Sequence, residues 1–113
     1  MTDVDTYISQ FDQKTQRRLS TIRQTALDIF KNAKEGIYHS VPTIWVNGKD
    51  TLNYGAYKDH ITIWIGYELV PILKESYPHY QYKKASMKIQ NSDPLPDELI
   101  QEICNLTQII KSQ

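Results

Sequence analysis

Hydrophobic residues in the first third of the chain recur at helical spacing. Residues 3–10 can form a short leading helix, and Asp12 can cap a longer helix from Gln13 to about Ala33. We expect Gly36 to end that helix. Its apolar positions share one face: Leu19, Ile22, Ala26, Ile29, Phe30 and Ala33. Its basic side chains are expected to form a solvated outer face: Lys14, Arg17, Arg18, Arg23 and Lys31.

From Ile37 the apolar residues recur at every second position, which is typical of strands. The segment GIYHSVPTIWV predicts two strand segments with a break at Pro42, and NGKD predicts a turn. The segments TLNYGAY and HITIWIG predict a hairpin around Lys58-Asp59, and YQYKKASMKIQ predicts one or two further strands. Tight turns between consecutive strands require antiparallel pairing.

Two more helices are predicted in the second half of the chain. YELVPILKES predicts a short helix with Pro71 in its first turn, and a closing helix begins near Pro96. The buried stripe of the closing helix is expected to hold Leu99, Ile103, Leu106 and Ile110. The chain therefore predicts a single domain, residues 1–113, of the α+β class. It is a two-layer fold in which an antiparallel β-sheet has the N-terminal and C-terminal helices packed on one face.

Alternation along the central hairpin sorts its side chains between two faces. A two-residue turn at Lys58-Asp59 places Tyr57 opposite His60. The outer face then holds Asn53, Gly55, Tyr57, His60, Thr62 and Trp64. The core face holds Leu52, Tyr54, Ala56, Ile61, Ile63 and Ile65.

The neighbouring strands extend this assignment. A two-residue Asn47-Gly48 turn would put Ile44 and Val46 on the polar face, so an odd loop or a glycine bulge is expected around Asn47–Lys49. Ile44 and Val46 then join the core, and Thr43 and Trp45 join the outer face. In the last strand Ala85, Met87 and Ile89 are expected to point inward. The expected outward side chains there are Tyr82, Lys84, Ser86 and Lys88.

The predicted outer face combines aromatic, cationic and titratable side chains. It collects Trp45, Tyr57, His60, Trp64, Tyr82, Lys84 and Lys88. Such a surface can stack a planar ligand and hold an anionic group. A protein interface and plain packing under a loop are the alternatives.

Charge and composition narrow the classes of partner. The 113 residues carry 13 basic and 13 acidic side chains, so no net charge attracts nucleic acid or an anionic membrane. No apolar run approaches the length of a membrane span. The single cysteine, Cys104, cannot form an internal disulfide and is expected to be a structural thiol in the closing helix. A reducing cytosol, and hence a cytoplasmic location, is expected.

No catalytic or metal-binding motif is present in the sequence. His39, His60 and His79 lie far apart, and no HxxH, HExxH or CxxC spacing occurs. GxSxG, Walker and GxGxxG motifs are also absent. We therefore assign no catalytic residue, and a non-enzymatic role is expected.

Four segments carry a resemblance to a known family. They are DTYISQFDQKTQRRLSTIRQTALDIF, EGIYHSVPTIWVNGK, LNYGAYKDHITIWIG and PLPDELIQEI. In this order they resemble the YdhG-like family of small bacterial domains of unknown function, over nearly the whole chain. That family is similar to frataxin-like domains, and some members are described as intracellular iron chaperones. The resemblance implies iron as a cargo and Tyr57, Lys58 and His60 as site residues.

Three functions follow as hypotheses. The first is a binding protein for a small ligand, with Trp45 and Trp64 as stacking platforms and Lys84 or Lys88 as the anion clamp. The second is a protein-interaction module that forms a homodimer through the sheet or the basic helix. The third is a frataxin-like iron chaperone. Membrane and nucleic acid are not expected partners.

Overall fold

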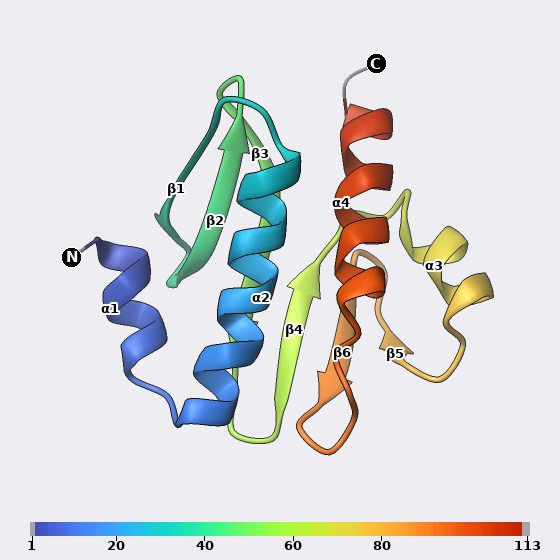
Figure 1. Ribbon diagram of the computed structural model, residues 1–113. Helices are drawn as coiled ribbons and strands as arrows, with labels where there is room; N and C mark the ends of the chain where they lie inside the picture. The colour runs from blue at the N-terminus through green and yellow to red at the C-terminus, as the bar shows by residue number, and fades with distance from the viewer. Residues whose placement is uncertain (1, 112–113) are drawn as a thin grey trace.

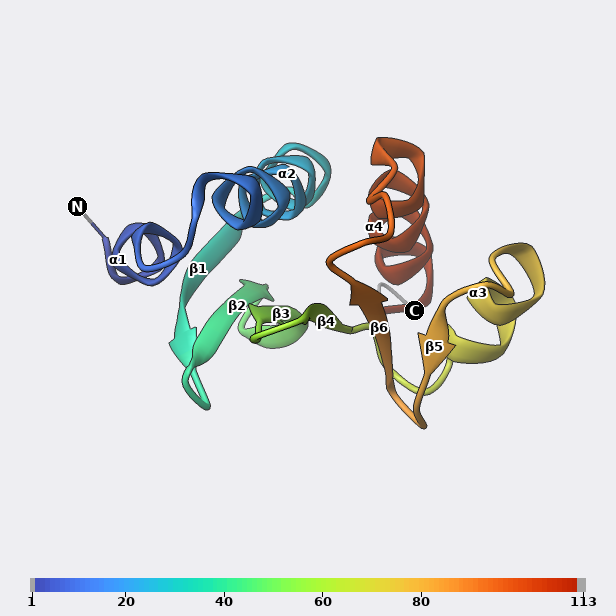
Figure 2. The same ribbon diagram turned by 90° about the horizontal axis from the view of Figure 1, so that it is seen from below.

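The computed structural model describes residues 2–111 and forms two layers (Figures 1 and 2). A six-stranded antiparallel sheet has the strand order β1-β2-β3-β4-β6-β5. The long helices α2 and α4 lie side by side on one face of it. In chain order the elements are α1 (Asp3–Ser9), α2 (Gln13–Ile29), β1 (Ala33–Tyr38), β2 (Val41–Val46), β3 (Lys49–Ala56), β4 (His60–Trp64), α3 (Val70–Ser76), β5 (Gln81–Tyr82), β6 (Ser86–Gln90) and α4 (Asp97–Lys111). The predicted α+β class and layer arrangement are confirmed.

Helix α2 begins as predicted, because the Asp12 side chain accepts a hydrogen bond from the Thr15 N–H. Its predicted end is wrong. The helix stops at Ile29, and Asn32, with φ 58°, reverses the chain before β1 starts at Ala33. Gly36 lies inside β1, where a Cβ would come within 3.2 Å of the Trp45 ring. Its small size therefore serves packing across the strands and not helix termination.

The first hairpin turns two residues earlier than the sequence predicts. Pro42 does not break a strand but lies in β2, opposite Ile37. The turn is His39-Ser40, with φ values of 53° and 69°. Positive φ at both central residues is the geometry of a two-residue hairpin turn whose twist matches the strands.

The second hairpin corrects the expected loop at Asn47–Lys49. Asn47-Gly48 is an ordinary two-residue turn with Val46 opposite Lys49, and φ is 54° and 78° at its two residues. The register shift follows in β3, since Trp45 faces Asp50 but Ile44 faces Leu52. Thr51 is thus the extra residue. A bulge is present, but in the strand, and it directs Ile44 into the core as expected.

The predicted division of the central hairpin into two faces is confirmed. Every residue of the expected core face is at most 6% exposed: Leu52, Tyr54, Ala56, Ile61, Ile63 and Ile65. His60, Thr62 and Trp64 point away from the helices and are half-buried. Met87 and Ile89 of β6 are buried beside Ile63 and Ile61, their partners across the strands.

Helix α4 buries a different stripe from the predicted one. Leu99 and Ile103 are buried, whereas Leu106 and Ile110 are only partly covered. The helix instead turns Ile100, Cys104 and Thr107 inward. Packing against both α2 and the sheet requires a wider apolar face than a narrow stripe provides.

The basic face of α2 was expected to be solvated, and for Arg23 and Arg18, which are part-buried, this is wrong, whereas Lys14 is exposed as expected. Arg23 donates to Glu35 of β1 and, at 2.7 Å, to Asp5 of α1. Arg18 donates to the carbonyls of Asp93 and Gln90 at 2.7 and 3.2 Å, and Lys14 donates to that of Asn91. These side chains join α2 to its neighbours.

Candidate functional site

A hollow of ≈ 560 Å³ lies over β4, β6 and β5, on the sheet face opposite α2 and α4. It is lined by Tyr57, His60, Thr62, Trp64, Gln81, Tyr82, Lys83, Ser86 and Lys88. We call it the outer-face hollow. Four residues of the predicted site meet here although they come from separate strands and turns: Tyr57, His60, Trp64 and Lys88.

Strand register explains how these side chains come together. Lys88 of β6 lies between Thr62 of β4 and Gln81 of β5. Trp64 lies opposite Ser86 in the adjacent outward row. Because opposite residues in antiparallel strands share a face, these rows form a continuous floor.

An aromatic wall closes the end of the hollow at the β3–β4 turn. The Tyr57 and His60 rings stack with centroids 5.1 Å apart and an interplanar angle of 23°. The Tyr57 N–H donates to the His60 carbonyl at 2.8 Å, which holds the turn closed. Tyr57 keeps 45% of its surface exposed, so the wall remains accessible.

Asp59 orients the His60 ring. Its Oδ1 lies 2.7 Å from His60 Nδ1, and this hydrogen bond is the main cause that lowers the pKa of the Asp59 carboxyl. With Nδ1 engaged, Nε2 is the ring nitrogen left for a ligand.

The charges that line the hollow are positive. Lys83 and Lys88 contribute ammonium groups, and no carboxylate is among the lining residues. Asp59 lies just outside, close enough for Lys88 to help lower its pKa. The hollow therefore favours an anionic group over a cation.

Three predicted site residues lie elsewhere. Trp45 is in β2, with β3 between it and β4, and its ring meets Tyr38 edge-on at 6.2 Å. Lys58 and Lys84 are exposed at the two hairpin turns and do not line the hollow.

Tyr82 lines the hollow but does not project outward as expected. It lies opposite Met87, a core residue, and its hydroxyl donates to the carbonyls of Leu73 and Tyr77 at 3.2 and 2.8 Å. Burial raises the pKa of Tyr82 to about 12. It therefore anchors β5 to the end of α3.

Sequence reasoning missed Gln81 and Lys83 as lining residues. Gln81 lies in the two-residue strand β5, and Lys83 directly follows that strand. Both residues pair with β6. A strand this short has too few positions for alternation to define its face. The doublet Lys83-Lys84 beside an outward Lys88 was the available signal.

Within residues 2–111, no three His, Cys, Asp or Glu side chains are grouped closely enough to hold a metal ion. In the same range, no helix is both long and apolar enough to cross a membrane.

Comparison with known proteins identifies the fold. No family model and no curated protein matches the sequence. The crystal structure of YdhG from Bacillus subtilis, a protein of the DUF1801 family, superimposes with a TM-score of 0.86. The match covers 98% of this chain and 92% of that chain at 13% sequence identity. The expected resemblance to a YdhG-like domain is thus confirmed for the fold.

Proposed function

We propose that this chain, which shares the fold of Bacillus subtilis YdhG, is a non-enzymatic binding protein for a small planar anion. The ligand would occupy the outer-face hollow. One observation carries the proposal: stacked aromatic rings and two lysines line a single hollow of ≈ 560 Å³ that has no carboxylate among its lining residues. Ligand sites in proteins commonly fall in this size range and combine the same features.

The hollow offers separate places for a ring and for a charge. Trp64 and the Tyr57–His60 pair supply flat faces for stacking. Lys88 and Lys83 supply ammonium donors, and Thr62 lies beside Lys88 across the strands. Of the two alternatives that the sequence offered for the anion clamp, Lys84 or Lys88, only Lys88 lines the hollow, and it takes this role in the proposal. A nucleoside monophosphate has the matching chemistry, a planar base and an anionic group.

Tryptophan fluorescence tests the proposal directly. The chain has two tryptophans, so Trp45→Phe leaves Trp64 as the single reporter in the hollow. Titration with adenosine monophosphate should give a saturable change in emission. Adenosine, which lacks the anion, and inorganic phosphate, which lacks the ring, should both bind more weakly. A strictly linear response to all three would contradict the proposal.

Matched variants separate the hollow from general surface charge. Lys88→Met should weaken binding of adenosine monophosphate by about tenfold or more, since a hydrogen bond to a charged group is worth about 1.5–3 kcal/mol. Lys84→Met removes the same charge from the adjacent turn and should change the affinity little. Equal losses in the two variants would argue for nonspecific attraction.

The two alternative functions have less support. A second copy of the chain seated on the hollow would bury Tyr57 and Trp64, and light scattering that shows a monomer at high concentration would exclude it. Iron as a cargo requires grouped oxygen ligands. On α2 the acidic positions are Asp12, which caps the helix, and Asp28, which accepts from Gln24 at 3.0 Å. No grouping of carboxylates favours the iron hypothesis in residues 2–111.

A further inference from the structure

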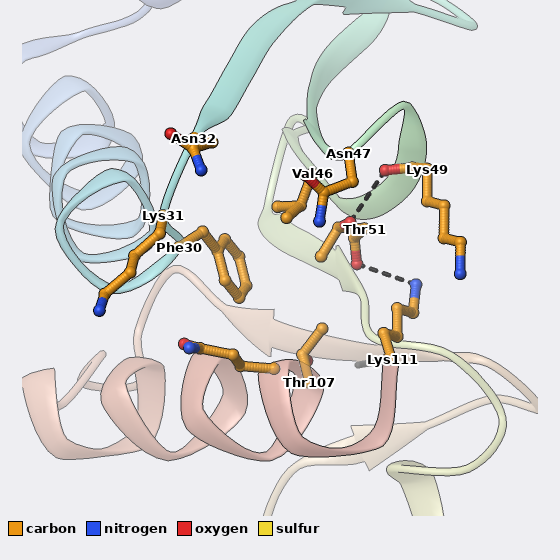
Figure 3. A pocket seen from close by; sticks show the side chains of 10 residues that line it. Phe30, Lys31, Asn32, Val46, Asn47, Lys49, Thr51, Thr107 and Lys111 are labelled. Carbon is orange, nitrogen blue, oxygen red and sulfur yellow. Dashed lines mark hydrogen bonds between the residues drawn. The ribbon is translucent and has the colours of Figure 1, made fainter. Parts of the chain in front are cut away.

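A second cavity, of ≈ 310 Å³, opens where the ends of α2 and α4 meet the β2–β3 hairpin (Figure 3). We call it the helix-end cleft. Its lining residues are Phe30, Lys31, Asn32, Val46, Asn47, Lys49, Thr51, Thr107, Gln108 and Lys111. None of them belongs to the outer-face hollow.

We propose that the helix-end cleft binds a small organic anion with an apolar body, of the aromatic carboxylate class. The site is separate from the proposed function and does not depend on it. Its residues come from three parts of the chain, so only the folded protein assembles it.

The inner part of the cleft is apolar. Phe30 is 3% exposed and its ring points into the space, facing Val46 and Thr107 (Figure 3). The Thr107 hydroxyl donates to the Ile103 carbonyl at 2.6 Å. Because that hydroxyl is used within α4, Thr107 lends the cleft mainly its methyl group. Phe30, Val46 and Thr107 can therefore take the apolar body of a ligand.

Lys111 is held at one side of the cleft with a donor to spare. Its ammonium group donates to the carbonyls of Asp50 and Thr51 at 3.1 and 3.0 Å. An ammonium group has three N–H donors, so one remains. The bulge at Thr51 presents one of these carbonyls, which ties the strand irregularity to the position of the lysine. Bulges are frequent next to functional sites.

The rim completes the site for an anion. Lys31 and Lys49 lie on opposite sides of the opening, and no carboxylate is among the lining residues. The negative ends of α2 and α4 contribute roughly half a negative charge each. Their combined charge is smaller than the positive charge of the three ammonium groups that line the cleft. Burial lowers the pKa of Lys111, and the carboxylates of Asp50 and Glu68, which lie outside the lining, partly offset this shift.

Two asparagines in the left-handed backbone conformation place their side-chain amides at the opening of the cleft. Asn32 and Asn47 have φ values of 58° and 54°. Asn32 directly precedes β1 and Asn47 directly follows β2, at points where the chain reverses, so the backbone sets their positions. Amide N–H donors beside the ammonium groups suit a carboxylate, which accepts several hydrogen bonds.

Benzoate is a suitable probe, and amide chemical shifts in ¹⁵N-labelled protein locate where it binds. Titration should produce saturable shifts at Asn47, Gly48 and Thr107. Benzyl alcohol, which keeps the ring but lacks the charge, and acetate, which keeps the charge but lacks the ring, should bind at least about fivefold more weakly. Shifts that are absent, linear, or stronger around Thr62 and Lys88 would overturn the proposal.

Variants test the named side chains. Lys111→Met should weaken the binding of benzoate about tenfold. Lys49→Met should weaken it about threefold and leaves the core untouched. Lys74→Met, on the exposed side of α3, is the charge-matched control and should have no effect. If Lys111→Met does not fold, the comparison of Lys49→Met with Lys74→Met tests the proposal by itself. Equal benzoate affinities in these two variants would refute the proposed binding site.

The two sites can fail independently. Adenosine monophosphate reports the outer-face hollow through Trp64, whereas benzoate reports the cleft through the hairpin amides. Loss of the first response with the second intact would reject the proposed function and keep this inference. The reverse result would reject the cleft only.

Discussion

Arg23 shows at the scale of one residue how a side chain predicted to be solvated can hold elements together. Its side chain is 22% exposed, and its planar group reaches Glu35 through two nitrogens and Asp5 through a third. These hydrogen bonds raise the pKa of Arg23, and hydrogen bonding within the N-terminal turn and to Arg23 lowers that of Asp5. The sequence spacing of 12 and 18 residues conceals this network.

Arg23→Met should lower the free energy of unfolding by about 2 kcal/mol, because Glu35 is 18% exposed and loses its partner. Arg23→Lys should recover less than half of the loss, since an ammonium group cannot donate in two parallel directions. Urea unfolding of the three proteins measures this. The control is Arg17→Met, at an exposed position of the same helix, which should cost little.

Cys104 carries the clearest pH dependence of a single residue. It is fully buried, and burial raises the pKa of its thiol from 9.0 to about 12. The protonated thiol is therefore favoured in the folded state. The contribution of this thiol to the free energy of unfolding is complete below pH 9. It is lost above pH 9, where the thiol of the unfolded chain ionises.

Stability should accordingly decline between pH 9 and 10, by up to about 1.4 kcal/mol per pH unit from this group. Cys104→Ala should be less stable at neutral pH but should show a flatter decline over that interval. Parallel curves for the two proteins would show that other groups dominate. Native Cys104 should also resist alkylation at pH 8 until the protein is unfolded.

Turns decide the geometry of whole elements in this fold. His39-Ser40 and Asn47-Gly48 both use positive φ, and they set the register of β1, β2 and β3. The sequence signal for the second turn was correct. The odd loop or glycine bulge expected around Asn47–Lys49 is not there, because the extra residue is Thr51, within β3. One bulge satisfied the core without altering the turn.

Gly48→Ala should destabilise the hairpin by about 1 kcal/mol, because φ is 78° there and no neighbour lies within 4 Å of an added Cβ. The cost is thus backbone strain without a clash. Asn47→Gly should change stability by less than about 0.5 kcal/mol, since glycine also adopts the φ of 54°. Thermal unfolding compares the two variants with the parent. Equal losses would show that side-chain contacts of the turn matter more than its dihedral angles.

Across the molecule, the order of the strands in the sheet brings the residues of the candidate site together. β6 enters the sheet beside β4, and β5 then closes the edge, so Lys88 and Lys83 reach Trp64 and Thr62. The same order leaves Trp45 two strands away from Trp64. All helices of the described residues pack on the other face or at the edges of the sheet, which leaves the outer face open (Figure 2).

This openness gives a prediction for the assembled fold. Trp64 is half-buried in the hollow. In the Trp45→Phe protein, acrylamide should quench Trp64 fluorescence more strongly without ligand than with saturating adenosine monophosphate. Tyr57→Ala should increase quenching further, because it removes one wall of the hollow. Tyr67→Ala, at a residue 68% exposed and outside the hollow, is the control.

The class of the fold and the division of the central hairpin into two faces could be predicted from the sequence alone. Alternation is a local property, so Ile61, Ile63 and Ile65 could be separated from His60, Thr62 and Trp64 without knowledge of the rest. The folded arrangement of the chain sets which strands are neighbours, and therefore which lysines lie beside the aromatic rings. It also created the helix-end cleft, since Phe30, Thr51 and Lys111 meet through contacts between distant segments that no local period encodes.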